Sequence, residues 1–241
     1  MCALINRESL RKRPLLCYVT DRRSLALVQA SGSVGALLRK IQAVIAAGVD
    51  WVQIREKDLP SKELAYFTRQ ALKSAAKHSG TECIQILVND RLDVALAEHA
   101  GGAHLGENSV GMGEAMRLLS SAGARRSDFL IGVSCHSLAN AVAAAQSGAD
   151  YVFFGPVFDT PSKAGFGAPQ GLARLAEVCG KVSIPVIAIG GISLENAGSC
   201  VVAGAAGVAA IRLFQDTADP RERVWALHEM LARGSSEAAN R

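Results

Sequence analysis

The chain has few aromatic residues, no closely spaced cysteine pair and no long apolar run. Aromatic side chains make up 5% of its 241 residues. A cluster of basic residues near the start, Arg7, Arg11, Lys12 and Arg13, has no aromatic residue within it. Because nucleic-acid-binding faces combine basic and aromatic side chains, we expect no nucleic-acid partner. Part of the net charge of +4 therefore belongs to a solvated basic arm.

The six cysteines are scattered, and none lies in a Cys-X-X-Cys pair. This pattern is typical of buried, reduced thiols. The apolar stretch after the basic arm is interrupted by charged residues just after Thr20, so it does not resemble a secretory signal. No run reaches the roughly 18 apolar residues of a membrane-spanning helix. We therefore expect a cytoplasmic protein without a membrane partner, whereas a homo-oligomer remains open.

Eight short apolar runs each end in a polar or glycine cluster, and alanine-rich helical stretches separate them. Strands that alternate with such stretches predict βαβ units and a parallel sheet. Eight units in about 240 residues suit a single (β/α)8 TIM barrel of the α/β class, whose active site lies at the carboxyl ends of the strands. The predicted strands are Leu15–Thr20, Val49–Ile54, Gln85–Val88, Ala103–Leu105, Phe129–Ser134, Tyr151–Gly155, Val186–Ile189 and Gly207–Ile211.

One domain is expected, with a short segment on each side. Residues 1–13 read as a flexible N-terminal arm and residues 14–233 as the catalytic barrel. Residues 234–241 read as a polar, disordered tail. A last helix over Pro220–Arg233 has apolar residues at spacings of three and four, the pattern of a helix that covers a barrel wall.

Polar residues after the second predicted strand suggest an anion site. Gln53, Arg55 and Lys57 alternate along the chain, so we expect them to face the same way. Two cations and an amide suit a phosphate or a diphosphate. The alternative is that Arg55 and Lys57 pair with Glu56 and Asp58 at the rim.

The third predicted strand is followed by Asn89 and Asp90. Asp90 either caps the next helix or holds a Mg2+ ion, because magnesium takes carboxylates together with substrate phosphates. The cap interpretation would prevail without the rest of the site.

The fifth predicted strand ends at Ser134, and Cys135 and His136 follow it. Adjacent residues in a strand face opposite ways, so a direct pair between the Cys135 thiol and the His136 imidazole is not expected. We expect Ser134 to point inward and His136 to lie at the mouth of the barrel.

A long loop follows the sixth predicted strand and carries Thr160, Ser162 and Lys163. Long loops inside compact domains are usually functional. Two hydroxyls and a lysine in four residues could close around an anion, so we interpret this loop as an anion clasp.

The seventh and eighth predicted strands end at Gly190–Gly191 and at Ile211–Arg212. Glycines let backbone N–H groups approach a phosphate at a helix start, and barrels often bind phosphate between these two loops. Arg212 either joins this site or pairs with Asp216.

Together these motifs resemble thiamine-phosphate synthase and its close relative, the thiazole tautomerase. The resemblance extends from about Leu15 to Phe214. The segments that carry it are VQIREK, LVNDRLDVAL, GAHLGEN, IGVSCHS, GADYVFFGPVFDTPSK and IPVIAIGGI.

The synthases couple hydroxymethylpyrimidine diphosphate to a thiazole phosphate and release diphosphate. The resemblance implies this transferase activity, small phosphorylated substrates and Mg2+ as cofactor. It further implies that diphosphate leaves first, that a pyrimidine-methyl cation forms, and that the thiazole nitrogen attacks this cation. The implied diphosphate ligands are Gln53, Arg55, Lys57, Asn89 and Lys163, with Asp90 on Mg2+, Ser134 beside the pyrimidine, and Thr160, Ser162, Gly190 and Gly191 on the thiazole phosphate.

Three positions depart from the family pattern. Glu107 stands where the family usually has Gln, Ser109 where it has a second Mg2+-binding Asp, and Arg212 where it has Ser. The change at Ser109 weakens the metal site, for which Glu107 is a substitute candidate. Arg212 either strengthens phosphate binding or narrows the pocket beside Ile211.

Two alternatives stay open. In a thiazole tautomerase, His136 would move a proton on the thiazole carboxylate phosphate. The chain also fits a non-catalytic barrel that binds a phosphorylated ligand. Asp90 and Lys57 favour the synthase, because the tautomerases tend to lose the Asp and the diphosphate lysine.

Overall fold

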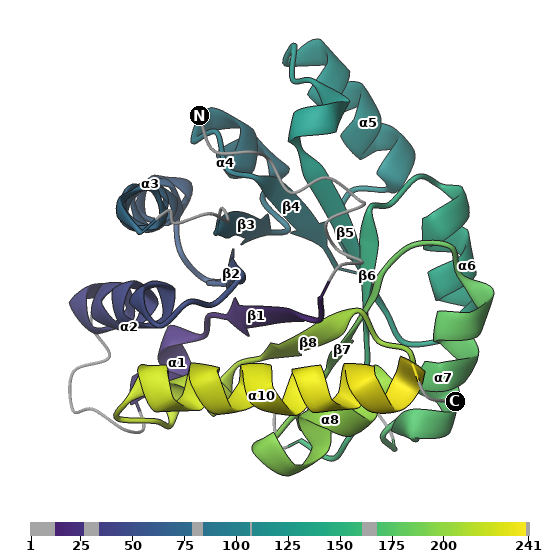
Figure 1. The fold of residues 1–241 in the computed structure, drawn as a ribbon. Coiled ribbons are helices and arrows are strands. Elements are labelled where there is room, and N and C mark those ends of the chain that lie inside the picture. The colour runs from purple at the N-terminus through teal and green to yellow at the C-terminus, as the bar shows by residue number, and fades with distance from the viewer. Residues whose placement is uncertain (1–12, 27–33, 79–83, 107, 161–167, 240–241) are drawn as a thin grey trace.

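Eight parallel strands close into a barrel in the computed structural model, which describes residues 13–26, 34–78, 84–106, 108–160 and 168–239. Each strand pairs with the next, and β8 pairs with β1. The predicted (β/α)8 barrel is confirmed (Figure 1). The strands are β1 Leu15–Val19, β2 Trp51–Ile54, β3 Gln85–Asn89, β4 Gly102–Leu105, β5 Leu130–Cys135, β6 Tyr151–Phe154, β7 Val186–Ile189 and β8 Gly207–Ala210.

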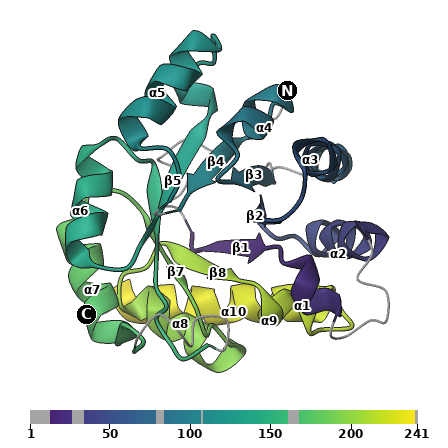
Figure 2. The ribbon, with the colours of Figure 1, turned by 180° about the vertical axis from the view of Figure 1, so that it is seen from behind.

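Helices surround the ring of strands in both views (Figure 1, Figure 2). Within the described residues, no helix is both long and apolar enough to cross a bilayer. The helices are α1 Arg22–Ala26, α2 Val34–Ala46, α3 Ser61–Lys77, α4 Leu92–Ala97, α5 Met112–Ser121, α6 Leu138–Gln146, α7 Gly171–Lys181, α8 Leu194–Val202, α9 Arg212–Gln215 and α10 Pro220–Ala239, with a short 3-10 turn at Arg126–Asp128.

Strand alternation divides the apolar side chains between two cores. Residues such as Val52 and Ile54 belong to the larger cluster, which lies between the strands and the helices. Their neighbour Trp51 belongs to a smaller cluster inside the barrel, together with Tyr151. The Tyr151 ring lies across Gly132, where a Cβ atom would stand 2.0 Å from the Tyr151 Cζ atom. Glycine at this position therefore makes room for an aromatic ring in the barrel interior.

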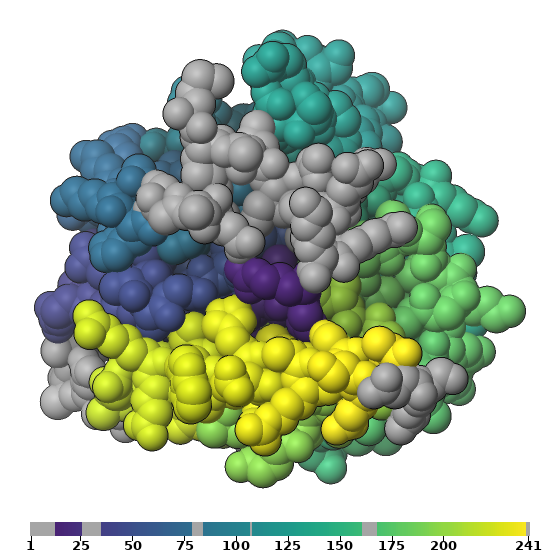
Figure 3. All heavy atoms as spheres, in the orientation of Figure 1, coloured from purple at the N-terminus to yellow at the C-terminus, as the bar shows by residue number. Residues whose placement is uncertain are grey.

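The C-terminal helix is longer than the sequence predicts. The predicted disordered tail from Gly234 is wrong as far as Ala239, because α10 continues to that residue. It runs across one face of the molecule (Figure 3). A Cβ atom on Gly234 would lie 2.5 Å from the carbonyl oxygen of Gly198 in α8. The glycine that suggests a helix end instead permits close approach of two helices. The predicted arm, apart from residue 13, lies outside the described residues.

We expect Gly234→Ala to destabilise the protein by about 1–3 kcal/mol, because the added methyl group would collide with the α8 backbone. The matched control is Gly180→Ala in α7, where a Cβ atom has open space around it. There the higher helix propensity of alanine should leave the free energy of unfolding unchanged or raise it by about 1 kcal/mol. Urea unfolding measures both variants, and equal midpoints would contradict the proposed close approach of α8 and α10.

Candidate active site at the barrel mouth

A chain of hydrogen bonds links the ends of β2, β3 and β4. The Gln53 Nε2 atom donates to Asn89 Oδ1 over 2.8 Å, and Asn89 Nδ2 donates to Asp90 Oδ2 over 2.6 Å. The other carboxylate oxygen of Asp90 accepts from the Gly106 N–H at 2.9 Å and from the Ser109 hydroxyl. Four of the residues implicated by the sequence, Gln53, Asn89, Asp90 and Ser109, therefore form one network.

Asp90 has a positive φ of 60°. Its N–H donates to the carbonyl oxygen of His104 at 2.8 Å, so the backbone is fixed on β4 while the carboxylate lies among polar groups. The helix α4 has Arg91 at its N-cap position, with no side-chain capping bond. The interpretation of Asp90 as the capping residue is therefore wrong.

The network offers oxygen ligands that suit Mg2+. The described residues contain no cluster of three His, Cys, Asp or Glu side chains, so they do not form an all-protein metal cage. Magnesium commonly binds one or two carboxylates together with substrate phosphates and water. Asp90, with the Ser109 hydroxyl beside it, fits that kind of shared site. Glu107, the other candidate ligand, lies outside the described residues.

The end of β2 is held by Thr20, the residue that follows β1. The Thr20 hydroxyl accepts from the Arg55 N–H at 2.9 Å and donates to Glu56 Oε1 at 2.7 Å. Glu56 is buried. Burial raises the pKa of its carboxyl group, whereas Thr20 and Arg22 counteract the rise. Thr20 therefore fixes the backbone of Arg55, just after the end of β2.

The acidic residues beside Arg55 and Lys57 pair with other cations. Arg22 binds Asp58 through two hydrogen bonds of 2.5 and 2.6 Å and also contacts Glu56 at 3.2 Å. The Arg22 guanidinium lowers the pKa of Asp58. Rim pairing is thus observed, but with a different arginine from the one considered in the sequence. No described carboxylate forms an ion pair with Arg55 or Lys57.

The expected alternation holds inside β2 and ends with it. Trp51 lies in the inner core, and Gln53, on the same strand face, bonds to Asn89 of the next strand. The strand ends at Ile54, and Lys57 lies in an exposed turn. The alternation therefore does not extend to Lys57, because it requires extended backbone, and the expected diphosphate contact of Lys57 stays a prediction.

A buried histidine lies beneath Ser134. The His104 Nε2 atom is 2.9 Å from the Ser134 hydroxyl, and its Nδ1 atom is 3.2 Å from the Tyr151 hydroxyl. The His104 ring also packs against Phe153, with ring centroids 4.3 Å apart. Burial lowers the pKa of His104 to about 3. The negative charge of Asp90 opposes this shift, whereas the positive charge of Arg55 adds to it. The ring is therefore neutral at physiological pH, and both charged residues lie near it.

Cys135 and His136 have separate surroundings. Cys135 is buried in the cluster between strands and helices, while His136 Nδ1 bonds to the carbonyl oxygen of Gly155. Because a carbonyl only accepts, Nδ1 carries a proton in this bond, and Nε2 is the atom left for acid–base chemistry.

The glycine pair after β7 adopts backbone angles that other residues rarely reach. The φ angles of Gly190 and Gly191 are +93° and +67°. A Cβ atom on Gly191 would lie 2.5 Å from the carbonyl oxygen of Asp159. The pair therefore also makes room for the loop after β6. Within the described residues, the N–H groups of Gly191 and Ile192 have no hydrogen-bond acceptor.

The end of β8 lies next to this glycine pair, because β7 and β8 are neighbours. Ile211 packs partly against the inner core. Arg212 begins α9 and is exposed. Its link to Asp216 is a backbone hydrogen bond of 2.8 Å, and no described carboxylate pairs with its guanidinium.

The loop after β6 is described only in part. Thr160 is half-buried. Ser162 and Lys163 lie outside the described residues.

Sequence reasoning assigned no role to Thr20, His104 or Tyr151. The pattern that marks the last two lies in the strand register: Gly132 and Tyr151 are register partners, and His104 is the register partner of Gly132 on its other side. A glycine flanked by two large polar rings on neighbouring strands indicates that the rings meet above it. Strand register, however, is not visible in a single sequence.

His104 should make stability fall at acid pH. Its pKa is lower in the folded protein than the ordinary value of about 6.5. Below pH 6.5 the His104 side chain is therefore protonated in the unfolded chain but stays neutral in the folded protein. The free energy of unfolding should therefore drop between about pH 6.5 and 3, by up to about 1.4 kcal/mol per pH unit. His104→Gln should flatten this acid limb in urea titrations.

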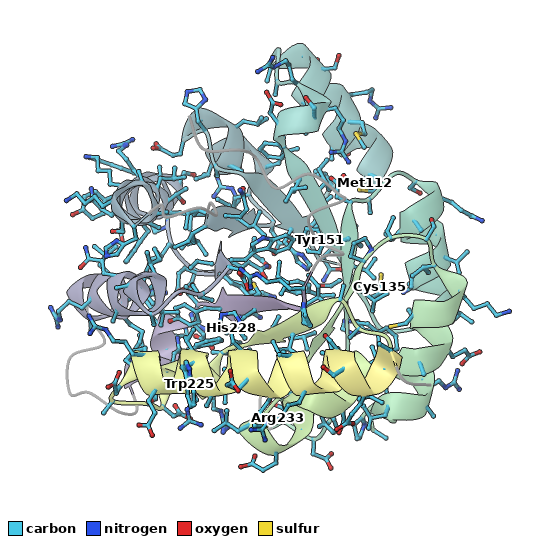
Figure 4. The ribbon with its side chains drawn as sticks, viewed as in Figure 1. Met112, Cys135, Tyr151, Trp225, His228 and Arg233 are labelled. Carbon is cyan, nitrogen blue, oxygen red and sulfur yellow. The ribbon has the colours of Figure 1, made fainter. Side chains whose placement is uncertain are left out.

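The matched control is His228→Gln on α10, at the outer surface (Figure 4). That variant should keep the wild-type slope. Identical slopes for the two variants would contradict the neutral state of His104.

Comparison with known proteins shows the family of the chain. The family model described as thiamine monophosphate synthase matches residues 19–214. A putative thiamine-phosphate synthase of Geobacter sulfurreducens is 43% identical over 216 residues, covering 90% of this chain and 93% of that protein. A thiamine-phosphate synthase of Chlorobium phaeobacteroides is 37% identical, covering 91% and 97%.

A solved structure agrees with the sequence matches. Thiamine phosphate pyrophosphorylase from Pyrococcus furiosus has a TM-score of 0.77 and 27% identity, and the alignment covers 94% of this chain and 99% of that one. These similarities confirm the predicted class of enzyme, a transferase of thiamine biosynthesis. The chain belongs to the thiamine monophosphate synthase family.

Proposed function

We propose that this enzyme joins hydroxymethylpyrimidine diphosphate to a thiazole phosphate and releases diphosphate. The observation that carries the proposal is the separation of charges at the barrel mouth. Arg22 and Arg23 together balance the charges of Glu56 and Asp58, so Arg55 is available to an anion. Asp90, at the same mouth, suits a magnesium ion. A cation and a metal-binding carboxylate in one mouth match a diphosphate leaving group.

Arg55, Lys57 and Asn89 would bind the diphosphate, and Lys163 would join them from the loop after β6. Asp90 would hold Mg2+ together with the diphosphate oxygens, with Ser109 beside it. When bound, the metal would neutralise charge that develops on the departing diphosphate. Arg55 would do the same from the end of β2.

Gln53 suits the pyrimidine better than the diphosphate. Its Nε2 atom already donates to Asn89, whereas its buried Oε1 atom has no partner in the described part of the chain. An unpaired buried acceptor is costly and would repel a diphosphate oxygen. It would instead accept a hydrogen bond from an amino group. We therefore assign Gln53 to the amino group of the pyrimidine and Ser134 to the same ring.

The thiazole phosphate would bind at β7 and β8. The N–H groups of Gly191 and Ile192 supply neutral donors, and α8 begins shortly after them. Arg212 adds a positive charge that suits a phosphate. Thr160, Ser162 and Gly190 would complete this site, with Ile211 against the thiazole.

The reaction would then proceed without a protein nucleophile. The bond between the pyrimidine methylene carbon and the diphosphate oxygen breaks, and the electron pair leaves with diphosphate. The thiazole nitrogen attacks the resulting cation and forms the new carbon–nitrogen bond. The protein's contribution is to stabilise the leaving charge and to align the nucleophile.

The described free thiols Cys17, Cys135, Cys179 and Cys200 support our further proposal of a cytoplasmic location.

A product assay with both substrates and Mg2+ tests this function. We expect thiamine phosphate to form, and a chelator to abolish its formation. Asp90→Asn should lower turnover by at least about 100-fold, which corresponds to roughly 3 kcal/mol for a lost charged ligand. Folded protein that gives no product would contradict the proposal and favour the tautomerase, with His136 as its acid–base group.

Ser109→Asp should strengthen the metal site. The variant adds a second carboxylate beside Asp90, so the Mg2+ concentration for half-maximal activity should fall about tenfold. Without Mg2+ the two carboxylates repel each other, so the melting temperature should drop and recover when Mg2+ is added. Asn108→Asp is the matched control, because it adds the same charge at an exposed neighbour. Equal Mg2+ dependence in both variants would contradict the assignment of Asp90.

A further inference from the structure

We propose that Tyr151 and His104 are positioning residues that fix the Ser134 hydroxyl as a hydrogen-bond donor toward the bound pyrimidine substrate. This inference rests on the proposed function for the identity of the substrate. The arrangement of the three side chains itself follows from contacts inside the barrel, and each bond in it has a direction that can be deduced.

The first bond joins Tyr151 to His104. Tyr151 is fully buried, lies inside the ring of strands (Figure 4) and has His104 Nδ1, 3.2 Å away, as the partner of its hydroxyl. If Nδ1 carried the histidine proton, that proton would point at the tyrosine oxygen. The tyrosine proton would then have no described acceptor, which is costly in a buried site. The tyrosine therefore donates, and Nδ1 accepts.

The second bond follows from the first. The His104 ring is buried between aromatic neighbours, with its centroid 4.3 Å from that of Phe153 and 5.6 Å from that of Tyr151. A neutral imidazole has one donor and one acceptor nitrogen. With Nδ1 as acceptor, Nε2 carries the proton and donates to the Ser134 oxygen over 2.9 Å.

The consequence concerns the free side of Ser134. Its oxygen already accepts from His104, so the hydroxyl proton is directed away from the ring. Ser134 is half-buried near the end of β5, whereas His104 is buried below it. The hydroxyl therefore presents a proton to the mouth and recognises an acceptor atom, such as a pyrimidine ring nitrogen. A substrate with a hydrogen-bond donor at that position would bind less well, because its proton would face the Ser134 hydroxyl proton.

The barrel interior is shaped for this relay. Gly132 lies between the register partners His104 and Tyr151, and a Cβ atom there would stand 2.4 Å from the Tyr151 hydroxyl. The missing side chain lets the tyrosine ring pass over β5 and reach His104. Any larger residue at 132 would displace the hydroxyl that begins the relay.

The test combines a spectroscopic and a kinetic readout. In full-length protein with isotope-labelled histidine, NMR at neutral pH should show the His104 proton on Nε2, with the signal assigned by its loss in His104→Gln. In Tyr151→Phe a fraction of the proton should move to Nδ1, because the donor to that atom is gone. A proton on Nδ1 in the wild-type protein would overturn the proposal, and this readout does not depend on turnover.

The kinetic readout compares two buried tyrosines. Tyr151→Phe should lower kcat/KM for the pyrimidine diphosphate about fivefold, the effect of one ordinary hydrogen bond, and leave KM for the thiazole phosphate unchanged. The matched control is Tyr18→Phe, which removes a buried hydroxyl bonded to Gln215 over 3.1 Å on the outer side of the strands. Equal kinetics in the two variants would overturn the relay.

Conservative replacement separates positioning from packing. Glutamine can place its amide nitrogen near the position of the histidine Nε2 atom and still donate to Ser134. His104→Gln should thus keep kcat/KM within about twofold of the wild type, whereas His104→Leu should lower it about tenfold. Equal losses in both variants would show that His104 acts only through packing. If no product forms with wild-type protein but the proton lies on Nε2, the synthase assignment fails and the relay stands.

Discussion

The pairing of β8 with β1 is the constraint on which the site depends. Closure of the ring forces alternate side chains into the barrel and brings all eight carboxyl ends to one mouth. Asp90, Ser134 and Gly191 are far apart in sequence and lie at or just after the ends of β3, β5 and β7, yet closure gathers them. The interior must then be filled, and Tyr151 fills it only because Gly132 leaves space. The side chains that we propose for substrate recognition are thus also part of the packed interior.

Charge at the mouth is organised by a second layer of contacts. Arg22 and Arg23 satisfy Asp58, and Thr20 with Arg22 satisfies Glu56. These contacts anchor α1 to the end of β2 and neutralise the acidic charge there. The positive charge of Arg55 is consequently not cancelled by its acidic neighbours. The partly buried ion pair between Arg22 and Glu56 holds these charges in place more than it adds to the stability of the fold.

The sequence predicts the fold well because hydrophobic alternation and helix spacing are local patterns, and eight repeats leave one plausible closure. It also predicts the row of polar residues at the strand ends. It does not predict which charges neutralise each other: Arg22 competes for Glu56 and Asp58 from another element, and only the fold brings it there. Gly234 illustrates the same limit, since its effect depends on Gly198 in a different helix. Likewise, His104 acquires partners only through strand register.

The loop after β6 and the glycine pair after β7 share two hydrogen bonds. Val157 and Phe158 donate their N–H groups to the carbonyl oxygens of Ile189 and Gly190 at 2.9 and 3.0 Å. One loop leads to Thr160, and the other carries the Gly191 and Ile192 N–H groups, so both belong to the site that we propose for the thiazole phosphate. The two hydrogen bonds tie these loops together. A substitution that shifts one loop is therefore expected to displace the phosphate donors that the other supplies.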